Sequence, residues 1–349
     1  MYSCIHDGFD HYNTTGERWD TVHGTIQYGA SYARFAAAPN CVGQGCRLVG
    51  GPTSYKIKNY NANVSQPIAS FAVMFETITS YYNTFLQFLD NGTCQISLGY
   101  TSSGQLVVYR GNGATALGSS SPGVVTGNTW YFIDIAATIG PGASGSVSVH
   151  LSTPKGGSAL IAVTGVNTSS DGNAWVNQVM IGDSNQNNDS LRFDDFHAHD
   201  ASGSAPNSIL GEGTRIYTKM PNGPGALTNW EPNGASANWQ CVDEVPPDMG
   251  TTYVSAPGLV EDNYAVGEAG FTGTVNGLVR RSLIQKTDAG AHTFQNGVRS
   301  VGVDQFGAAA TVLSSWAYVD SFSSTDPSTS EPWTASGADA ASMSIYGAS

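Results

Sequence analysis

Charge is scarce in this sequence, because only 12% of its 349 residues are Asp, Glu, Lys or Arg. Acidic residues outnumber basic ones by 27 to 14, which gives a formal net charge of −13 at pH 7. The shortage of basic residues holds in both halves of the chain, since 8 precede residue 200 and 6 follow it. Proteins that bind nucleic acids contact the phosphates through a surface rich in Lys and Arg. So few basic side chains cannot form such a surface, and nucleic acid is therefore excluded as a partner.

Long apolar runs and helical periodicity are missing as well. No stretch approaches the ~20 apolar residues of a membrane-spanning helix, so we expect no membrane insertion. The residues after Met1 (YSCIHDGFDHY) lack the basic and apolar segments of a signal peptide, from which we expect folding in a reducing cytosol. No window of about a dozen residues repeats its apolar side chains with the helical period of 3.6.

Cysteine is rare, with five residues at irregular spacing. An odd number without a regular pattern is a poor disulfide framework. Cys41 and Cys46 (CVGQGC) could close a small loop, and free buried thiols are an equally valid interpretation. The sequence leaves both alternatives open.

Glycine, by contrast, is abundant (42 residues), and Ser, Thr and Asn are frequent throughout. These residues favour tight turns. Between the turns lie short runs of alternating or continuously apolar residues, such as 68–76 (IASFAVMFE), 84–89, 94–100 and 130–138 (WYFIDIAAT). Many short strands separated by turns predict an all-β protein of antiparallel sandwich or jelly-roll type.

The segment from Leu191 to Tyr217 divides the chain. Residues 191–200 (LRFDDFHAHD) alternate like a strand, residues 201–210 are small, polar and interrupted by proline, and a new strand-like run starts near Thr214. We therefore predict two antiparallel β-sandwich domains in tandem, over residues 1–200 and 211–349, joined by a linker at 201–210.

The first domain resembles the laminin-G-like, concanavalin A-like jelly rolls. The resemblance rests on the paired strands FAVMFE and FLQFLD, on GNTWYFIDIAAT and on the closing strand RFDDFHAHD. It implies that the last strand pairs beside the first, and it leaves room for a structural Ca²⁺ as the only cofactor.

The second domain resembles a module of tailed-bacteriophage virion proteins. Several blocks match in order, among them RIYTKMPNGPGALTNW (215–230), NWQCVDEVPPD (238–248), VRRSLIQKTDAG (279–290) and DPSTSEPWT (326–334). The resemblance implies a structural part of the virion surface, such as a tail, fibre, head spike or decoration, assembled in the host cytoplasm. Its expected partners are other virion proteins, copies of itself and a host surface glycan.

Catalytic residues are not predicted. Glycoside hydrolysis needs two carboxyl groups about 5–10 Å apart, but the first 200 residues contain only Glu17 and Glu76 as glutamates. Asp194 and Asp195 are adjacent and would point to opposite faces of a regular strand. We therefore expect a protein that is not an enzyme. The alternatives are a polysaccharide depolymerase of the phage tail and a purely architectural decoration protein.

The same strand contains a candidate metal site. Asp195, His197 and His199 would share one face if the strand were regular, which is a plausible zinc ligand set. However, Phe193 and Phe196 both belong in a core, which implies a bulge near the aspartates. With that bulge we expect the two histidines on the solvent face, and we predict no metal ligands.

The best candidate for a glycan site is Trp175 together with the segment GDSNQNN. A sugar would stack on the indole, and polar side chains would bind its hydroxyl groups. The alternative is a buried tryptophan beside an ordinary turn. The predicted glycan-binding residues are Trp175, Asp183, Asn185, Asn187 and Asn188.

The strand expected at 311–321 supplies a candidate interface. Alternation places Leu313, Ala317 and Val319 on one face and Trp316 and Tyr318 on the other. These two aromatic side chains need cover from a partner subunit, a neighbouring loop or a second sheet of the same domain. We predict a homo-oligomer in which Trp316 and Tyr318 lie at the interface.

Overall fold

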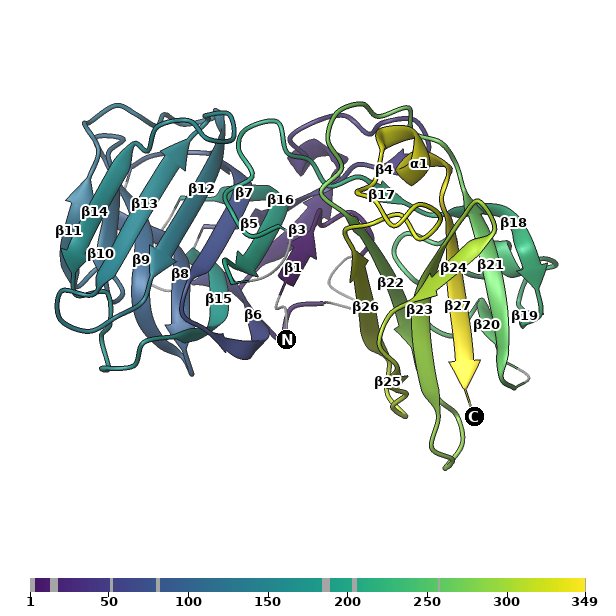
Figure 1. Cartoon of the computed structure of the whole chain (residues 1–349). Helices are drawn as coiled ribbons and strands as arrows, with labels where there is room; N and C mark the ends of the chain where they lie inside the picture. The colour runs from purple at the N-terminus through teal and green to yellow at the C-terminus, as the bar shows by residue number, and fades with distance from the viewer. Residues whose placement is uncertain are drawn as a thin grey trace. The chain divides into compact units, whose positions relative to one another are not determined.

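The computed structural model describes residues 4–12, 18–50, 53–79, 82–183, 189–202, 206–256 and 258–348. Its regular secondary structure is almost entirely β-strand, which confirms the predicted all-β class. The chain divides into two compact units (Figure 1). Unit 1 comprises Met1–Phe9, Trp19–Ala36 and Gln44–Ile216; unit 2 comprises Asp10–Arg18, Ala37–Gly43 and Tyr217–Ser349. None of the helices in the described ranges has the length and hydrophobicity needed to cross a membrane.

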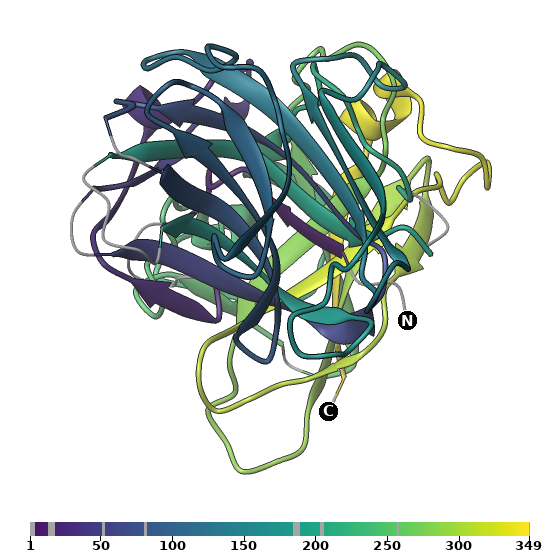
Figure 2. The same ribbon diagram turned by 90° about the vertical axis from the view of Figure 1, so that its left-hand side faces the viewer.

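Unit 1 is a sandwich of two antiparallel sheets, whose layers can be followed in Figures 1 and 2. The strands of sheet A are, in spatial order, β14 (Ile161–Val166), β13 (Gly145–Leu151), β12 (Trp130–Thr138), β7 (Pro67–Phe75), β16 (Leu191–Asp200), β5 (Gly45–Leu48) and β3 (Ile26–Gly29), with β1 (Cys4–Asp7) also paired to β16. The strands of sheet B are β11 (Thr115–Ser119), β10 (Leu106–Arg110), β9 (Thr93–Thr101), β8 (Tyr82–Asp90), β15 (Val176–Asp183), β6 (Ser54–Val64) and β2 (Thr21–His23).

The core of unit 1 follows from the alternation of its strands. Phe71, Val73 and Phe75 lie on one face of β7 and are all fully buried. Phe71 and Phe75 contact Phe85 of sheet B, with ring centroids 6.3 and 5.3 Å apart. Burial of one such side chain contributes about 2–3 kcal/mol to folding. The pairing of β1 with β16 confirms the expectation that the last strand lies beside the first.

The bulge expected in β16 is present. The pairing of β16 with β7 shifts register between Asp194 and His197, and Asp195 has a φ of 50°. The extra residue lets both Phe193 and Phe196 enter the core, where each is fully buried and contacts Phe71. Two aromatic side chains that a regular strand would have divided between its faces therefore share one face.

The segment expected to be a linker is part of unit 1. The backbone N–H groups of Leu210 and Gly211 donate hydrogen bonds to the carboxylate of Asp134 on β12. Leu210 itself is only 7% exposed. The boundary expected at residues 201–210 is therefore displaced, because a buried carboxylate anchors this segment on sheet A, and the units divide after Ile216.

Unit 2 is built on one larger antiparallel sheet with shorter two-stranded ribbons. The sheet contains, in order, β18 (Pro221–Thr228), β21 (Val260–Val266), β27 (Ser342–Ala348), β23 (Thr293–Ser300) and β24 (Val303–Phe306), with β25 (Ala310–Thr311) also paired to β23. The ribbons are β19 (Glu231–Asn233) with β20 (Tyr253–Ser255), β22 (Leu278–Ile284) with β26 (Ala317–Ser323), and β4 (Cys41–Val42) with β17 (Thr218–Lys219).

Short helical segments complete both units. They are the 3₁₀ turns η1 (Ala30–Tyr32) and η2 (Asn238–Cys241), and the helix α1 (Ala335–Ala340). The helix begins after Thr334, whose side chain accepts a hydrogen bond from the backbone N–H of Gly337. This N-cap satisfies one of the donors that a helix start leaves free.

The strand expected at 311–321 is interrupted. Residues 312–316 separate β25 from β26, and Leu313 is 51% exposed instead of lying on an inward apolar face. One core cluster of unit 2 instead contains Tyr264, Phe294 and Ile345 of the main sheet with Val312, and another contains Val298, Trp333, Ala338 and Ala341. All five cysteines are free thiols, so Cys41 and Cys46 do not close a loop.

Candidate functional site

Trp175 lies in the loop between β14 and β15 and is half-buried. The loop is attached to the β8–β9 turn through the buried carboxylate of Asp90. The side-chain amides of Asn173 and Asn177 donate to Asp90 over 2.7 and 3.0 Å. Asn177 in turn accepts a hydrogen bond from the backbone N–H of Asn91. The indole is therefore flanked on both sides by residues that are fixed to the neighbouring hairpin.

The same loop has a second attachment to β9. The fully buried Gln95 donates from its amide to Asp171 over 2.7 Å and accepts from the backbone N–H of Ser170. Two buried side chains, Asp90 and Gln95, thus hold the loop on both sides of Gly172. A loop with so many fixed hydrogen bonds loses little conformational entropy when a ligand binds.

Of the predicted partners of Trp175, the structure describes only Asp183, and this residue does not lie beside it. Asp183 is the last residue of β15 and Trp175 immediately precedes its first, so the strand separates them by about 25 Å at ~3.3 Å per residue. Asn185, Asn187 and Asn188 lie outside the described residues. The polar groups beside Trp175 are instead Asn173, Asn177 and Asp90, because the β8–β9 turn, not the end of β15, adjoins this loop.

A row of polar side chains crosses the outer face of sheet A. Directly opposed residues in the register run from His150 on β13 through Asp134 on β12, Ser70 on β7 and His197 on β16 to His6 on β1. Directly opposed residues share a face of the sheet, so these five side chains form one line. Ser70 donates a hydrogen bond to Asp134.

His197, in this row, and His199, two residues further along β16, are both buried. The expectation that they face solvent is therefore wrong. Their exposed fractions are 4% and 0%. Strand β1 lies beside them, and Leu210 and Gly211, which bind Asp134, run over the same face. Burial together with the neighbouring His6 and His199 holds the pKa of His197 well below its usual range. Burial likewise lowers the pKa of His199 to about 4.

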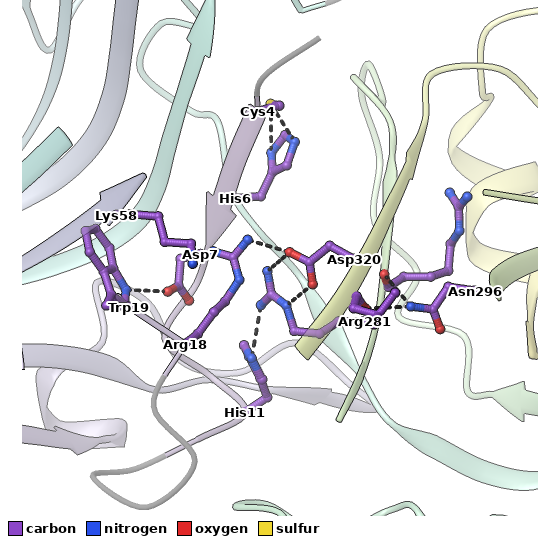
Figure 3. Close-up of polar contacts among 12 residues, drawn as sticks. Cys4, His6, Asp7, His11, Arg18, Trp19, Lys58, Arg281, Asn296 and Asp320 are labelled. Atoms are coloured by element: carbon purple, nitrogen blue, oxygen red, sulfur yellow. Dashed lines mark hydrogen bonds and ion pairs between the residues drawn. The ribbon is translucent and has the colours of Figure 1, made fainter. Parts of the chain in front are cut away.

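Cys4, His6 and His197 form a compact group at the end of this row. Figure 3 shows Cys4 and His6 projecting together from β1. Cys4 Sγ lies 2.8 Å from His6 Nε2 and 3.8 Å from His197 Nε2, and the Nδ1 atoms of the two histidines are 2.6 Å apart. Among the described residues, it is the one set of three His, Cys, Asp or Glu side chains close enough to share a metal ion.

Asp195 does not join the histidines as the regular-strand pattern had suggested. The bulge turns the carboxylate of Asp195 toward Arg34, with a guanidinium nitrogen 3.7 Å from Oδ2. The backbone N–H of Ile216 donates a hydrogen bond of 2.8 Å to the other carboxylate oxygen, Oδ1. Burial raises the pKa of Asp195 to about 6, against the opposing effects of Ile216 and Arg34. Asp194 accepts from the backbone N–H of Arg34. Both aspartates therefore hold chain segments together.

Sequence reasoning missed Cys4 and His6. The available signal was a Cys-x-His pair on the first strand and a His-x-His pair on the last, each placing two side chains on one face at a spacing of two. The predicted pairing of these two strands would have brought the pairs together.

The carboxylate of Glu76 is committed to arginines. Arg47 binds it with two hydrogen bonds of 2.8 and 2.6 Å, and Arg192 adds a third of 2.7 Å. The hydrogen bonds from Arg47, opposed by burial, lower the pKa of Glu76. Glu17, the other glutamate before residue 200, lies outside the described residues.

Of the two candidate interface residues in unit 2, Tyr318 has a neighbour of its own unit. The ring of His11 meets the ring of Tyr318 edge-on, with centroids 5.8 Å apart. Trp316 precedes β26 and is half-buried. A loop of unit 2 thus supplies cover for Tyr318, which was one of the alternatives left open.

On the same face of β26 lies an ion-pair cluster around Asp320 (Figure 3). Arg281 donates two hydrogen bonds to this carboxylate, over 2.8 and 3.1 Å, and Arg18 adds a further one. His11 Nε2 lies 3.0 Å from a guanidinium nitrogen of Arg281. Although burial alone would raise it, the pKa of Asp320 is held well below its usual range by the charges of Arg281 and Arg18.

Comparison by sequence finds no match, either among protein-family models or among curated proteins. Solved structures give distant similarities. An endo-β-1,4-glucuronan lyase from the fungus Trichoderma reesei has a TM-score of 0.40 at 13% identity, over 57% of this chain and 94% of the lyase. The cellulose-induced protein Cip1 has a TM-score of 0.40 at 15% identity, over 60% of this chain and 100% of Cip1. The botulinum neurotoxin serotype C1 binding domain has a TM-score of 0.32 at 14% identity, over 44% of this chain and 39% of that one.

Proposed function

We propose that this protein is a non-enzymatic structural component of a phage virion surface, which helps the particle adhere to a glycan on the host. The proposal rests first on the blocks of residues 215–334, whose order resembles the tailed-phage virion module. Apart from Arg215 and Ile216, these blocks fall within unit 2, which also includes the N-terminal segments Asp10–Arg18 and Ala37–Gly43.

The glycan-binding part of the proposal is carried by the loop of Trp175. A half-buried indole on a loop fixed by Asp90 and Gln95 offers a preorganised aromatic surface. Sugars present C–H faces that stack on such rings, and neighbouring amides bind their hydroxyl groups. We therefore place the glycan site at Trp175, Asn173 and Asn177.

The binding experiment compares Trp175→Ala with Trp175→Phe on capsular polysaccharide and lipopolysaccharide from the host. Loss of the aromatic ring should weaken binding at least ~10-fold, as expected for a central aromatic contact. The phenylalanine variant keeps a ring and should retain most of the affinity. Equal binding by the alanine variant and the unaltered protein would show that the glycan is bound elsewhere or not at all.

A non-enzymatic role is favoured by the engagement of five acidic side chains of unit 1. Glu76 is held by two arginines, Asp194 and Asp195 bind the backbone, and Asp90 and Asp134 fix loops. Carboxylates in these roles are poor candidates for the acid and base of glycan cleavage.

The competing function is a polysaccharide depolymerase. Incubation of the protein with the same polysaccharides, followed by assays for new reducing ends and for unsaturated products, separates the two functions. We expect neither signal above that of a heat-denatured control. Sustained product release would establish the depolymerase.

A further inference from the structure

We propose that Cys4, His6 and His197 bind one transition-metal ion, with Zn²⁺ as the cation best suited to the site. The inference is independent of the virion and glycan proposals, since it concerns a different part of unit 1.

The positions of the donor atoms support a shared ion. One ligand atom from each side chain lies within 4.8 Å of the others. Zinc bonds of about 2.3 Å to sulfur and 2.0–2.1 Å to nitrogen require donor separations of roughly 3.3–3.7 Å in a tetrahedral site. The separation of 3.8 Å between Cys4 Sγ and His197 Nε2 is close to that range. His6 lies nearer to both partners, with its Nε2 2.8 Å from Cys4 Sγ and its Nδ1 2.6 Å from His197 Nδ1, so its ring must turn away from them when the three side chains share an ion.

The identity of the donors selects the class of metal. A thiolate and two imidazoles are soft or intermediate ligands that suit Zn²⁺, whereas Ca²⁺ and Mg²⁺ require oxygen donors. Three protein ligands leave a fourth position for water or another ligand. The ring of His199 lies beside the group, with its centroid 4.7 Å from that of His197.

The scaffold holds the three side chains in place. His6 and His197 are directly opposed in the pairing of β1 with β16, and Cys4 lies two residues before His6 on the same face. Two neighbouring strands are a rigid support for a metal site. A bound ion would fasten the short strand β1, which has four residues, to the central part of sheet A. We therefore assign the ion a structural role at the N-terminal edge of unit 1.

The decisive experiment is a metal titration of the chelator-treated, reduced full chain without a polyhistidine tag. Zn²⁺ binding is measured by competition with a fluorescent chelator, and Co²⁺ binding by the thiolate-to-cobalt absorption band. We expect one equivalent of either ion and no competition from Ca²⁺. The absence of stoichiometric Zn²⁺ binding would overturn the proposal.

Matched variants locate the site. Cys4→Ser and His197→Gln should each weaken Zn²⁺ binding roughly 100-fold or more, because even the loss of groups that only orient ligands costs 10–100-fold. Cys94→Ser and His150→Gln change the same residue types outside the cluster and should leave binding unaltered. Unchanged affinity in Cys4→Ser would contradict the assignment.

A measurement on the unaltered protein covers the case in which the buried His197 variant fails to fold. Alkylation of each cysteine is followed by peptide mass spectrometry with and without Zn²⁺. The ion should protect Cys4 strongly and leave the rate at Cys94 as it was. Equal alkylation of Cys4 in both conditions would refute the site.

Discussion

Replacement of Asp320 by Asn tests how the face of β26 is held together in unit 2. The substitution keeps the size of the side chain and removes the charge that binds Arg281 and Arg18. These arginine side chains are only 13% and 7% exposed, while that of Asp320 is 29% exposed. Removal of one partner from a fully buried pair costs about 3–5 kcal/mol, and an exposed pair contributes about 0–1 kcal/mol. The intermediate burial of this cluster places the expected loss at about 2–3 kcal/mol.

The pH dependence of this loss identifies its cause. Because the folded-state pKa of Asp320 is depressed, its contribution is complete above the unfolded pKa of about 3.9 and is lost as the pH falls through the folded value. Calorimetry of the full chain between pH 5 and 8 should show the transition of unit 2 lowered by roughly 5–10 °C. Below about pH 4 the difference between variant and unaltered protein should shrink.

Asp288→Asn provides the control, because Asp288 pairs with His292 on the open surface and should contribute little. Two results would refute the reasoning about Asp320. One is an unchanged transition temperature, and the other is a difference of the same size at pH 3 and pH 7.

Three further predictions concern the turn, the core and the assembly. Val301 and Gly302 form the two-residue turn between β23 and β24, with φ values of 48° and 83°. Asn tolerates a positive φ better than the β-branched Val, so Val301→Asn should stabilise unit 2 by about 1 kcal/mol in thermal unfolding. A lower transition temperature would contradict this. Phe71→Ala should destabilise unit 1 by about 3–5 kcal/mol in urea titration, and a loss below about 1 kcal/mol would mean that the two sheets close over the cavity. Light scattering should show a homo-oligomer that Trp316→Ala weakens, whereas a monomer at every concentration would remove the proposed interface.

The strand pattern of unit 1 was largely predictable because its signal is local. The run WYFIDIAAT coincides with β12, and LRFDDFHAHD coincides with β16. The bulge in β16 could also be predicted, since Phe193 and Phe196 cannot both reach the core from a regular strand.

Features that depend on contacts between residues distant in the sequence could not be predicted from local patterns. The burial of His197 depends on β1 and on the segment near Leu210, which sequence alone presents as a flexible linker. The break between β25 and β26 could not be predicted from the sequence either. Leu313 fits an alternating strand pattern, but it lies in the segment between the two strands and is exposed. The attachment of the Trp175 loop to the β8–β9 turn could not be predicted for the same reason, because Asp90 is distant from this loop in the sequence.

The central claim, that the protein is a structural component of a virion surface, is tested most directly on purified phage particles. Serum raised against the chain is used for gold labelling of intact particles, and the same particles are analysed by quantitative mass spectrometry. We expect this chain among the particle proteins at a fixed copy number and gold at a defined position on the outer surface. Particles of full infectivity that lack the chain and bind no gold would contradict it.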